Sequence, residues 1–173
     1  MKRKIDVTDY ANDIIKAMCP GILLTTKAGD QVNSMVIGWG TLGRVWEKPV
    51  FIAYVRDRRY TREMLDRNPE FTVNVPLGAF DKHAFSVCGT KSGRDMDKIA
   101  AAGFTLEEPE IISVPGIREF PLTLECRLLY REEQTSARLG ADIRKKFYSV
   151  ETDDHICFYG EIVEAYIIED EKG

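Results

Sequence analysis

Apolar and polar side chains alternate along several short segments of this chain, and such alternation predicts β-strands. Residues 71–75 show the pattern most clearly, with apolar side chains at the odd positions and polar ones at the even positions. The same period runs through residues 121–130 and residues 155–168. In the last segment the phase slips near Gly160, as it does at a β-bulge. These segments predict three strands, the last of them long and irregular.

Two other stretches add to the predicted sheet. Residues 21–39 indicate two strands around a turn at Ala28–Asp30, and residues 49–56 indicate another strand, rich in β-branched and aromatic side chains. Residues 104–121 contain three prolines among short apolar pairs and indicate a connecting loop.

Three segments carry the spacing and the end signals of helices. Residues 6–18 repeat apolar side chains every four residues behind a capping aspartate, residues 61–69 begin at Thr61 as a cap, and residues 92–102 precede Gly103 as a terminating glycine. Because these helices are too few for regular β-α-β alternation, the pattern favours an antiparallel barrel, and the fold class is mainly β.

Composition places residues 1–173 in one globular domain, since 44% of them are hydrophobic and 30% are charged. The net charge of −4 gives no basic field that would attract nucleic acid or an anionic membrane surface. No apolar segment approaches the roughly 20 residues of a membrane-spanning helix, and the basic N-terminus lacks the apolar core of a signal peptide. We therefore expect a cytoplasmic protein.

The cysteines and histidines do not indicate a metal site. The four cysteines are scattered without a C-x-x-C pair, and they form no close cluster with the two histidines, so a structural zinc ion is not expected. Cys19, Cys126 and Cys157 are expected to be buried free thiols, and His83 is expected to be structural. Because no Ser/His/Asp set or G-x-S-x-G elbow is present, hydrolase chemistry has no support.

Residues 38–43 spell G-W-G-T-L-G, which matches the glycine fingerprint of a dinucleotide-binding loop. That fingerprint requires a helix that begins at the loop, because the helix N-terminus binds the pyrophosphate. Only five residues separate Gly43 from Pro49, too few for a crossover helix. A barrel loop whose backbone passes close to a flat ligand is the better interpretation of Gly38 and Gly40.

Two stretches of the sequence could bind a ligand, one a planar ring and the other a phosphate group. The amide of Asn33 offers donors and an acceptor for the edge of a heteroaromatic ring, and the small residues beside Trp39 would let a planar ring approach the backbone. The three arginines of residues 56–61 come directly before a predicted helix start, a combination that binds phosphate. The alternatives are a structural turn with a core Trp39 and a solvated charged loop.

Two more stretches could complete a site. Residues 88–98 form a polar, glycine-containing loop without Walker A spacing, and Lys98 on the following helix could reach an anion or a ring carbonyl. His155 follows two aspartates, which tend to favour its protonated form. The alternatives here are a simple capped surface helix and a histidine that merely ends a strand.

Five motifs occur in an order that resembles the flavin reductase-like family of FMN-binding split barrels, and within it the flavoredoxin-like branch. From about residue 20 to residue 166 they read N-S-M-V-I-G-W-G-T-L-G, P-V-F-I-A-Y-V-R-D-R-R-Y-T, E-F-T-V-N-V-P, C-G-T-K-S-G-R-D-M-D-K and D-H-I-C-F-Y-G-E-I-V. The resemblance implies a six-stranded antiparallel barrel with flanking helices, forming a homodimer with FMN near the subunit interface.

The resemblance also implies site residues. The residues that would line the isoalloxazine are Asn33, Ser34, Met35, Gly38, Trp39, Gly40 and Thr41. Those at the phosphate end are Arg56, Arg58, Tyr60 and Thr61, with Asn74 at the ribityl chain. The opposite wall would be Cys88, Gly89, Ser92, Gly93 and Lys98, and His155 would be the catalytic residue on the nicotinamide side. Many members carry more hydroxyls where this chain has Met35-Val-Ile, so contacts there would come from the backbone.

The implied function is an FMN-dependent oxidoreductase. A hydride would pass from NAD(P)H to FMN, and electrons would then leave to a flavin, a redox partner protein or a small-molecule acceptor. One alternative is a flavoredoxin-type electron carrier without its own NAD(P)H site. Another is a barrel that binds a different planar cofactor, such as a deazaflavin or haem.

Overall fold

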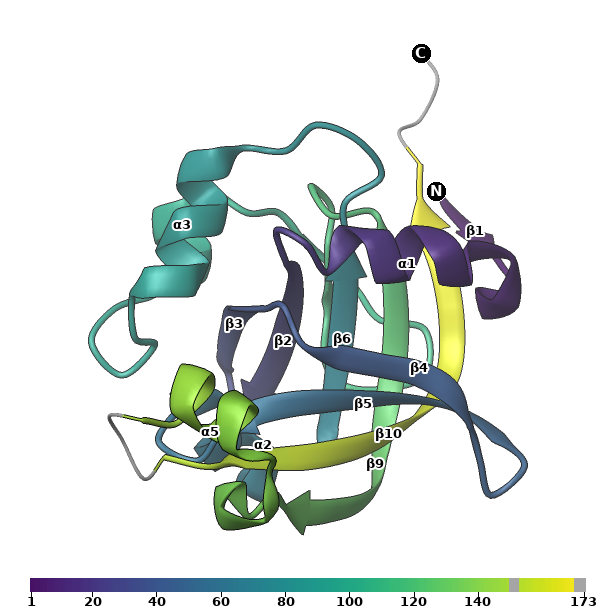
Figure 1. The fold of residues 1–173 in the computed structure, drawn as a ribbon. Coiled ribbons are helices and arrows are strands. Elements are labelled where there is room, and N and C mark those ends of the chain that lie inside the picture. Colours follow the sequence, from purple (N-terminus) through teal and green to yellow (C-terminus); the bar gives the residue numbers. More distant parts are fainter. Residues whose placement is uncertain (150–152, 170–173) are drawn as a thin grey trace.

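The computed structural model describes residues 1–149 and 153–169. Within them, one antiparallel sheet has eight strands in the order β3-β2-β6-β9-β10-β5-β4, with β1 paired to the far end of β10 (Figure 1). The strands of this sheet are β1 Lys2–Lys4, β2 Ile22–Ala28, β3 Gln31–Ile37, β4 Gly40–Val45, β5 Lys48–Arg56, β6 Glu70–Val75, β9 Leu122–Glu133 and β10 His155–Ile168. A separate pair is formed by β7 Leu106–Glu107 and β8 Gly116–Ile117.

All six strands expected from the alternation are present, and the mainly β, antiparallel class is confirmed. The eight-stranded sheet contains two strands that were not expected, β1 and β4. The short pair of β7 and β8 lies in the segment that was expected to be a connecting loop. The short β1 has no apolar pattern that could have predicted it. The strand β4 replaces most of the expected glycine loop, because residues 40–45 pair along the whole first half of β5.

The sheet bends so that its two halves cross. In Figure 1, β2, β3 and β6 run upright, whereas β4, β5 and much of β10 run across them. The long pair of β9 and β10 belongs to both halves, with register shifts at Tyr159/Gly160 and Ile162/Glu164. The first shift confirms the predicted slip. A β-carbon on Gly160 would lie 2.9 Å from that of Cys126 and would overlap the ring of Phe71, so the bend needs a glycine.

The main core lies between these two halves. Phe51, Phe71 and Phe158 are fully buried there, and Ile14 of the N-terminal helix closes one end. The even positions of residues 71–75 are buried as well, because the segment that follows residue 103 covers that face of β6. The polar side of this strand is therefore an internal polar layer.

Helices flank the sheet. They are η1 Val7–Tyr10, α1 Ala11–Ala17, α2 Tyr60–Arg67, α3 Lys82–Thr90, α4 Lys98–Ala102, η2 Ser136–Arg138 and α5 Ala141–Phe147. The predicted helix over residues 92–102 is wrong in its first half, since α4 begins only after Asp97, whose carboxylate accepts a hydrogen bond from Ala100 N (3.0 Å). Thr61 is not the cap of α2, because Arg59 holds that position. His83 lies on α3, which the pattern did not predict.

The expected burial of three cysteines is confirmed for two of them. Cys19 is exposed, because it follows α1 in a surface turn, whereas Cys126 and Cys157 are buried as expected.

The turn between β4 and β5 consists of Trp46 and Glu47, both in the left-handed region with φ values of 51° and 61°. This is the backbone of a two-residue type I′ hairpin, built without glycine or asparagine.

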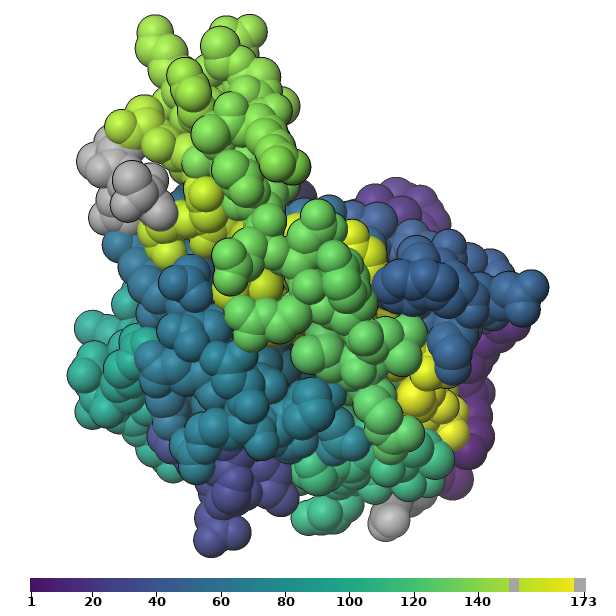
Figure 2. Space-filling view, turned by 90° about the horizontal axis from the view of Figure 1, so that it is seen from below, coloured from purple at the N-terminus to yellow at the C-terminus, as the bar shows by residue number. Residues whose placement is uncertain are grey.

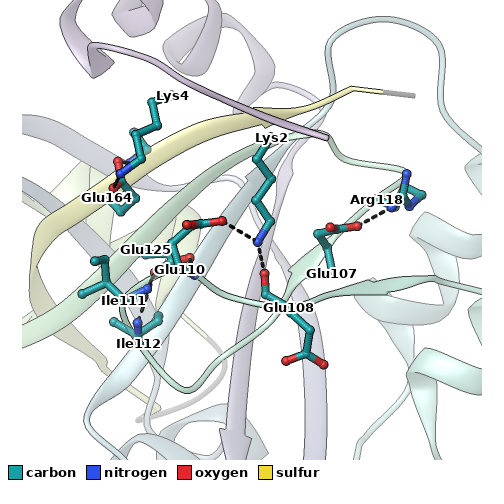
Figure 3. A network of polar contacts seen from close by, with 11 residues as sticks. Lys2, Lys4, Glu107, Glu108, Glu110, Ile111, Ile112, Arg118, Glu125 and Glu164 are labelled. Atoms are coloured by element: carbon teal, nitrogen blue, oxygen red, sulfur yellow. Dashed lines mark hydrogen bonds and ion pairs between the residues drawn. The ribbon is translucent and has the colours of Figure 1, made fainter. Parts of the chain in front are cut away.

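Glu125 of β9 fixes the proline-containing loop against the sheet (Figure 3). Its buried carboxylate accepts hydrogen bonds from the backbone N–H groups of Glu110 (2.6 Å), Ile111 (2.8 Å) and Ile112 (3.1 Å). Beside it, Lys2 donates to Glu108 O and pairs with the Glu110 carboxylate (3.0 Å), which ties the chain start to the same loop. The loop is thus held by charge-assisted hydrogen bonds in place of strand pairing.

In the part of the chain that the structure describes, no helix has both the length and the apolar character required to cross a bilayer.

Candidate functional site

Two adjoining cavities lie beside β3. The first, which we call the arginine cavity, has a volume of about 180 Å³ and lies between β3, the start of α2 and residues 88–94. The second, the histidine cavity, also has about 180 Å³ and lies between the end of β3, Trp39 and His155. Both are lined by Met35, Val36 and Arg59, so they form one continuous trough.

The arginine cavity has a cationic end. Arg58 and Arg59 line it directly before α2, where unpaired backbone N–H groups and the helix dipole favour an anion. Arg58 is held in place by Asp153, with Nε 2.9 Å from Oδ2 and its backbone N–H 3.1 Å from Oδ1. Arg58 therefore binds within its own chain as well as facing the cavity.

The loop after α3 closes over this end. Arg94 donates to Arg58 O (3.2 Å), pairs with Glu63 of α2 and lies over the ring of Tyr60 at 5.4 Å. The hydroxyl of Tyr60 donates to Gln31 Oε1 (2.5 Å). Three elements, β3, α2 and the loop, are thereby joined around the cavity.

Asn33 forms the floor of the arginine cavity. It is buried, and its Nδ2 donates to Thr61 Oγ1 at 3.1 Å. Among the described residues, nothing donates to its buried Oδ1. Since buried acceptors are nearly always satisfied, this oxygen is a place where a guest N–H or O–H would bind. Gly93 packs directly on it, and a β-carbon there would overlap Oδ1 and lie 2.8 Å from the Asn33 carboxamide carbon.

Lys98 supplies a further cation to the same cavity. It is only 3% exposed, and its Nζ donates to Cys88 O at 3.1 Å, which leaves N–H donors for a guest. Burial lowers the pKa of this ammonium. Burial also raises the pKa of the Cys88 thiol, so Cys88 is a neutral wall residue. Lys98 is the first residue of α4, so it lies at the start of that helix.

His155 is a buried residue that lines the histidine cavity. It is 6% exposed, and its ring lies 4.8 Å from that of Trp39 at an interplanar angle of 36°. Burial, assisted by the charge of Arg56, lowers its pKa to about 4, although Asp153 and Asp154 act in the opposite direction. The expectation that two aspartates favour the protonated form is therefore wrong, because desolvation is the larger effect.

Arg56 lines the histidine cavity and does not line the arginine cavity, where the phosphate contact was expected. Its guanidinium donates to Asp153 O (2.8 Å) and Phe147 O (3.1 Å), and it lies 5.3 Å from the Tyr148 ring. These contacts hold the C-terminal end of α5 next to His155.

The structure brings most of the predicted residues together. The predicted residues that line the arginine cavity are Asn33, Met35, Arg58, Tyr60, Thr61, Cys88, Gly89, Ser92, Gly93 and Lys98. Gly38 and Trp39 line the histidine cavity. Gly40 and Thr41 lie further along, in a third cavity of about 560 Å³ beneath α5, which we call the α5 cavity.

Two predicted residues do not reach a described cavity. Asn74 is fully buried in the internal polar layer, where its Oδ1 accepts from Thr25 Oγ1 (2.8 Å) and its Nδ2 donates to Thr123 Oγ1 (3.3 Å). Its amide is occupied there, so the ribityl contact is wrong. Ser34 is also fully buried, and its Oγ lies within hydrogen-bond distance (3.1 Å) of Thr25 Oγ1.

Several residues in the described part of the site were not predicted, among them Arg59, Arg94, Tyr148 and Gln134. Arg59 and Arg94 line the arginine cavity, and the arginine run at residues 56–59 carried a signal for the first of them. Tyr148 and Gln134 reach the His155 region from either side of α5, in a segment without any regular pattern that would have indicated their position.

The structure is a bent antiparallel β-barrel with flanking helices. It has a cationic trough and a buried amide oxygen that no described residue pairs with. A protein of this class can hold a flat cofactor that carries a phosphate. The model of the family described as the flavin reductase like domain matches residues 18–173. The chain belongs to this family.

The chain is also similar to individual proteins. An uncharacterized protein of Archaeoglobus fulgidus is 32% identical over 105 residues, which cover 61% of this chain and 49% of that protein. The structure is similar to a flavoredoxin from Methanosarcina acetivorans (27% identity, TM-score 0.67) and to the flavoredoxin of Desulfovibrio vulgaris (24% identity, TM-score 0.68). Each alignment covers 86% of this chain and 69% of the other. The matches to curated relatives span only 49% to 59% of their length.

Proposed function

We propose that this protein binds FMN in the trough formed by the arginine and histidine cavities and acts as an oxidoreductase. The observation that carries the proposal is the buried Oδ1 of Asn33, which has no partner among the described residues and lies between a cationic helix start and the buried ammonium of Lys98. One molecule that carries both a phosphate and a ring edge rich in N–H and C=O groups would satisfy all three. The family assignment supports the same cofactor.

The protein's own groups have separate tasks in this proposal. Arg58, Arg59 and the N–H groups that begin α2 would bind the phosphate. Asn33 Oδ1 would accept a hydrogen bond from the ring edge, and the Lys98 ammonium would stabilise negative charge that develops on the ring. When bound, FMN supplies the electron transfer itself, because it accepts a hydride and releases electrons to an acceptor.

We further infer that NAD(P)H is the electron donor and that the histidine cavity is where it approaches. The flat face of Trp39 and the uncharged imidazole of His155 offer a wall for a planar ring beside the arginine cavity. Arg56 and Arg59 add positive charge for a phosphorylated donor. A homodimer, an external acceptor and a cytoplasmic location stay predictions.

A flavoredoxin-type electron carrier is the second candidate. It is favoured by the 27% identical flavoredoxin from Methanosarcina acetivorans, whose fold matches over 86% of this chain. A carrier would use the same FMN site but would take electrons from a partner protein instead of NAD(P)H.

Two measurements test the proposal. Titration with FMN should quench flavin fluorescence to saturation, and Lys98→Met should weaken binding while Lys91→Met, at the exposed rim of the same loop, should have a smaller effect. Absence of quenching in the parent protein would refute FMN binding. Anaerobic mixing of the FMN-loaded protein with NADH and with NADPH then separates the two functions, since loss of the oxidised flavin absorbance supports the reductase and its persistence supports the carrier.

A further inference from the structure

We propose that Tyr148, anchored by Gln134, is a positioning residue that fixes the His155 imidazole with its proton on Nδ1, so that the lone pair of Nε2 faces the histidine cavity. The catalytic use of that lone pair rests on the proposed function. The position of the proton does not, because it follows from contacts within the chain.

Hydrogen-bond geometry assigns the proton. The hydroxyl of Tyr148 lies 2.7 Å from His155 Nδ1 and donates to Gln134 Oε1 at 3.1 Å. A phenol has one proton, so a Tyr148 that donates to Gln134 can only accept from His155. Nδ1 is therefore the N–H donor, and in the neutral ring Nε2 has no proton.

The backbone keeps Gln134 in register with His155. The N–H of Gln134 donates to His155 O at 2.8 Å, just beyond the last paired residues of β9 and β10. The acceptor of the Tyr148 proton is thus fixed to the same residue whose ring Tyr148 contacts. The three residues form a closed set, and a shift of the Tyr148 side chain would break two hydrogen bonds.

Packing holds the imidazole in this orientation. Trp39 covers one side of it, and the Tyr148 ring meets it edge-on, at 5.6 Å and 84°. Arg56 in turn lies 5.3 Å from the Tyr148 ring. Among the described residues, none forms a hydrogen bond with Nε2, and the ring lines the histidine cavity.

Burial and the surrounding charges keep this imidazole neutral near pH 7. Burial is the main effect that disfavours a second proton, and Arg56 of β5 and Arg59 at the start of α2 add to it. Asp153 and Asp154, directly before β10, raise the pKa of His155, but their effect is smaller than the lowering. A neutral imidazole with a free lone pair accepts a hydrogen bond or a proton, so the complementary guest carries an N–H or O–H group at this point, such as a carboxamide.

The test is the protonation pattern of the imidazole nitrogens. The chain has only two histidines, so in full-length His83→Gln protein, labelled with ¹⁵N-histidine, every imidazole signal belongs to His155. At pH 7 we expect Nδ1 to show the shift of a protonated nitrogen and Nε2 that of an unprotonated one. A spectrum with the proton on Nε2 would overturn the proposal.

Tyr148→Phe in the same background tests the role of Tyr148. We expect the protonation pattern to change to a mixture or to the Nε2-protonated form, while circular dichroism shows a folded barrel. Tyr54→Phe is the matched control, because Tyr54 lines the same cavity but bonds to Thr41 (3.3 Å). If Tyr148→Phe leaves the imidazole spectrum unchanged, Tyr148 does not position the ring. The measurement requires no FMN, so failure to bind FMN would leave its outcome readable.

Discussion

Gly93 packs against the carboxamide of Asn33 so closely that no side chain fits between them. A β-carbon at residue 93 would overlap Oδ1 and would lie 2.9 Å from a ring carbon of Tyr60. This contact brings the loop after α3 onto β3, where the Asn33 oxygen is buried and no described residue donates to it. The glycine is therefore required by a close approach in the candidate site and not by its backbone angles.

Gly93→Ala should push this loop away from Asn33. We expect a loss of about 1–3 kcal/mol in the free energy of unfolding, the usual cost of overpacking, and at least tenfold weaker FMN binding. Thermal or denaturant unfolding and FMN fluorescence titration measure the two effects. Gly43→Ala in β4 is the control, because a β-carbon there meets no atom within 4 Å. Equal FMN affinity in the two variants would contradict the role given to this contact.

Arg58→Ala should weaken FMN binding by about 1–3 kcal/mol, or roughly 5- to 150-fold, the scale of a charge-assisted hydrogen bond. Arg58 also pairs with Asp153, so a small loss of stability should accompany the change. Arg127→Ala is a matched control, since Arg127 is similarly exposed and pairs with Glu70 far from the trough. Fluorescence titration at low and high salt would show whether phosphate attraction is lost; unchanged affinity would assign Arg58 to Asp153 alone.

His155 should make stability depend on pH in a defined window. Its pKa is about 4 in the folded protein and near the ordinary 6.5 when unfolded, so between these values the unfolded chain binds more protons. The free energy of unfolding should therefore fall as the pH drops from 6.5 towards 4, by about 2.5 kcal/mol from this residue.

The measurement is the difference in unfolding free energy between the parent protein and His155→Gln, taken from pH 7.5 to pH 4.5. Subtraction removes the contribution of the carboxylates that titrate in both proteins. The parent should lose stability relative to the variant as the pH falls. A difference that does not vary with pH would mean that His155 is not desolvated in the folded state.

Glu125→Gln should destabilise the fold far more than Glu110→Gln. The first change removes the charge from a buried carboxylate that accepts three backbone N–H groups, and its new NH₂ would face one or two of those donors, at a cost of about 2–4 kcal/mol. The second removes only an ion pair with Lys2 near the surface, worth about 0–1 kcal/mol. Denaturant unfolding of both variants at pH 7 measures the difference, and comparable losses would contradict the assigned role of Glu125.

Glu47→Gly should stabilise the protein by about 0.5–1 kcal/mol. Glu47 has a φ of 61°, where residues other than glycine are strained, and its side chain is exposed. Glu132→Gly, at an exposed position in the regular strand β9, should instead be destabilising. A lower melting temperature for Glu47→Gly would show that its side chain makes a contribution larger than the relief of backbone strain.

Local patterns predicted most of the barrel, because alternation in the six expected strands follows from which face is buried. They failed where packing or pairing from elsewhere decided the outcome. Gly40–Val45 became a strand because β5 was available as a partner, and the even face of β6 was covered by a loop more than thirty residues away. Neither partner is visible in the segment itself.

The candidate site was predicted in proportion to how local its parts are. The arginine run and Asn33 each carry their chemistry in a few consecutive residues, and the trough contains both, together with Gly38 and Trp39 at the start of the expected glycine loop. The state of His155 was predicted with the wrong sign, because neighbouring aspartates are visible in sequence whereas burial and Arg56 are not. Asn74 was misplaced for the same reason, since its polar neighbours come from β2 and β9.

The contact between His155 and Tyr148 joins parts of the molecule that differ in local stability. His155 starts a strand held between β5 and β9, whereas Tyr148 ends α5, every residue of which is exposed and which projects from the body of the protein (Figure 2). Detachment of α5 would therefore release the imidazole while the barrel stays intact. Any molecule that wedges into the α5 cavity and favours the attached arrangement would, by mass action, also hold the proton of His155 on one nitrogen.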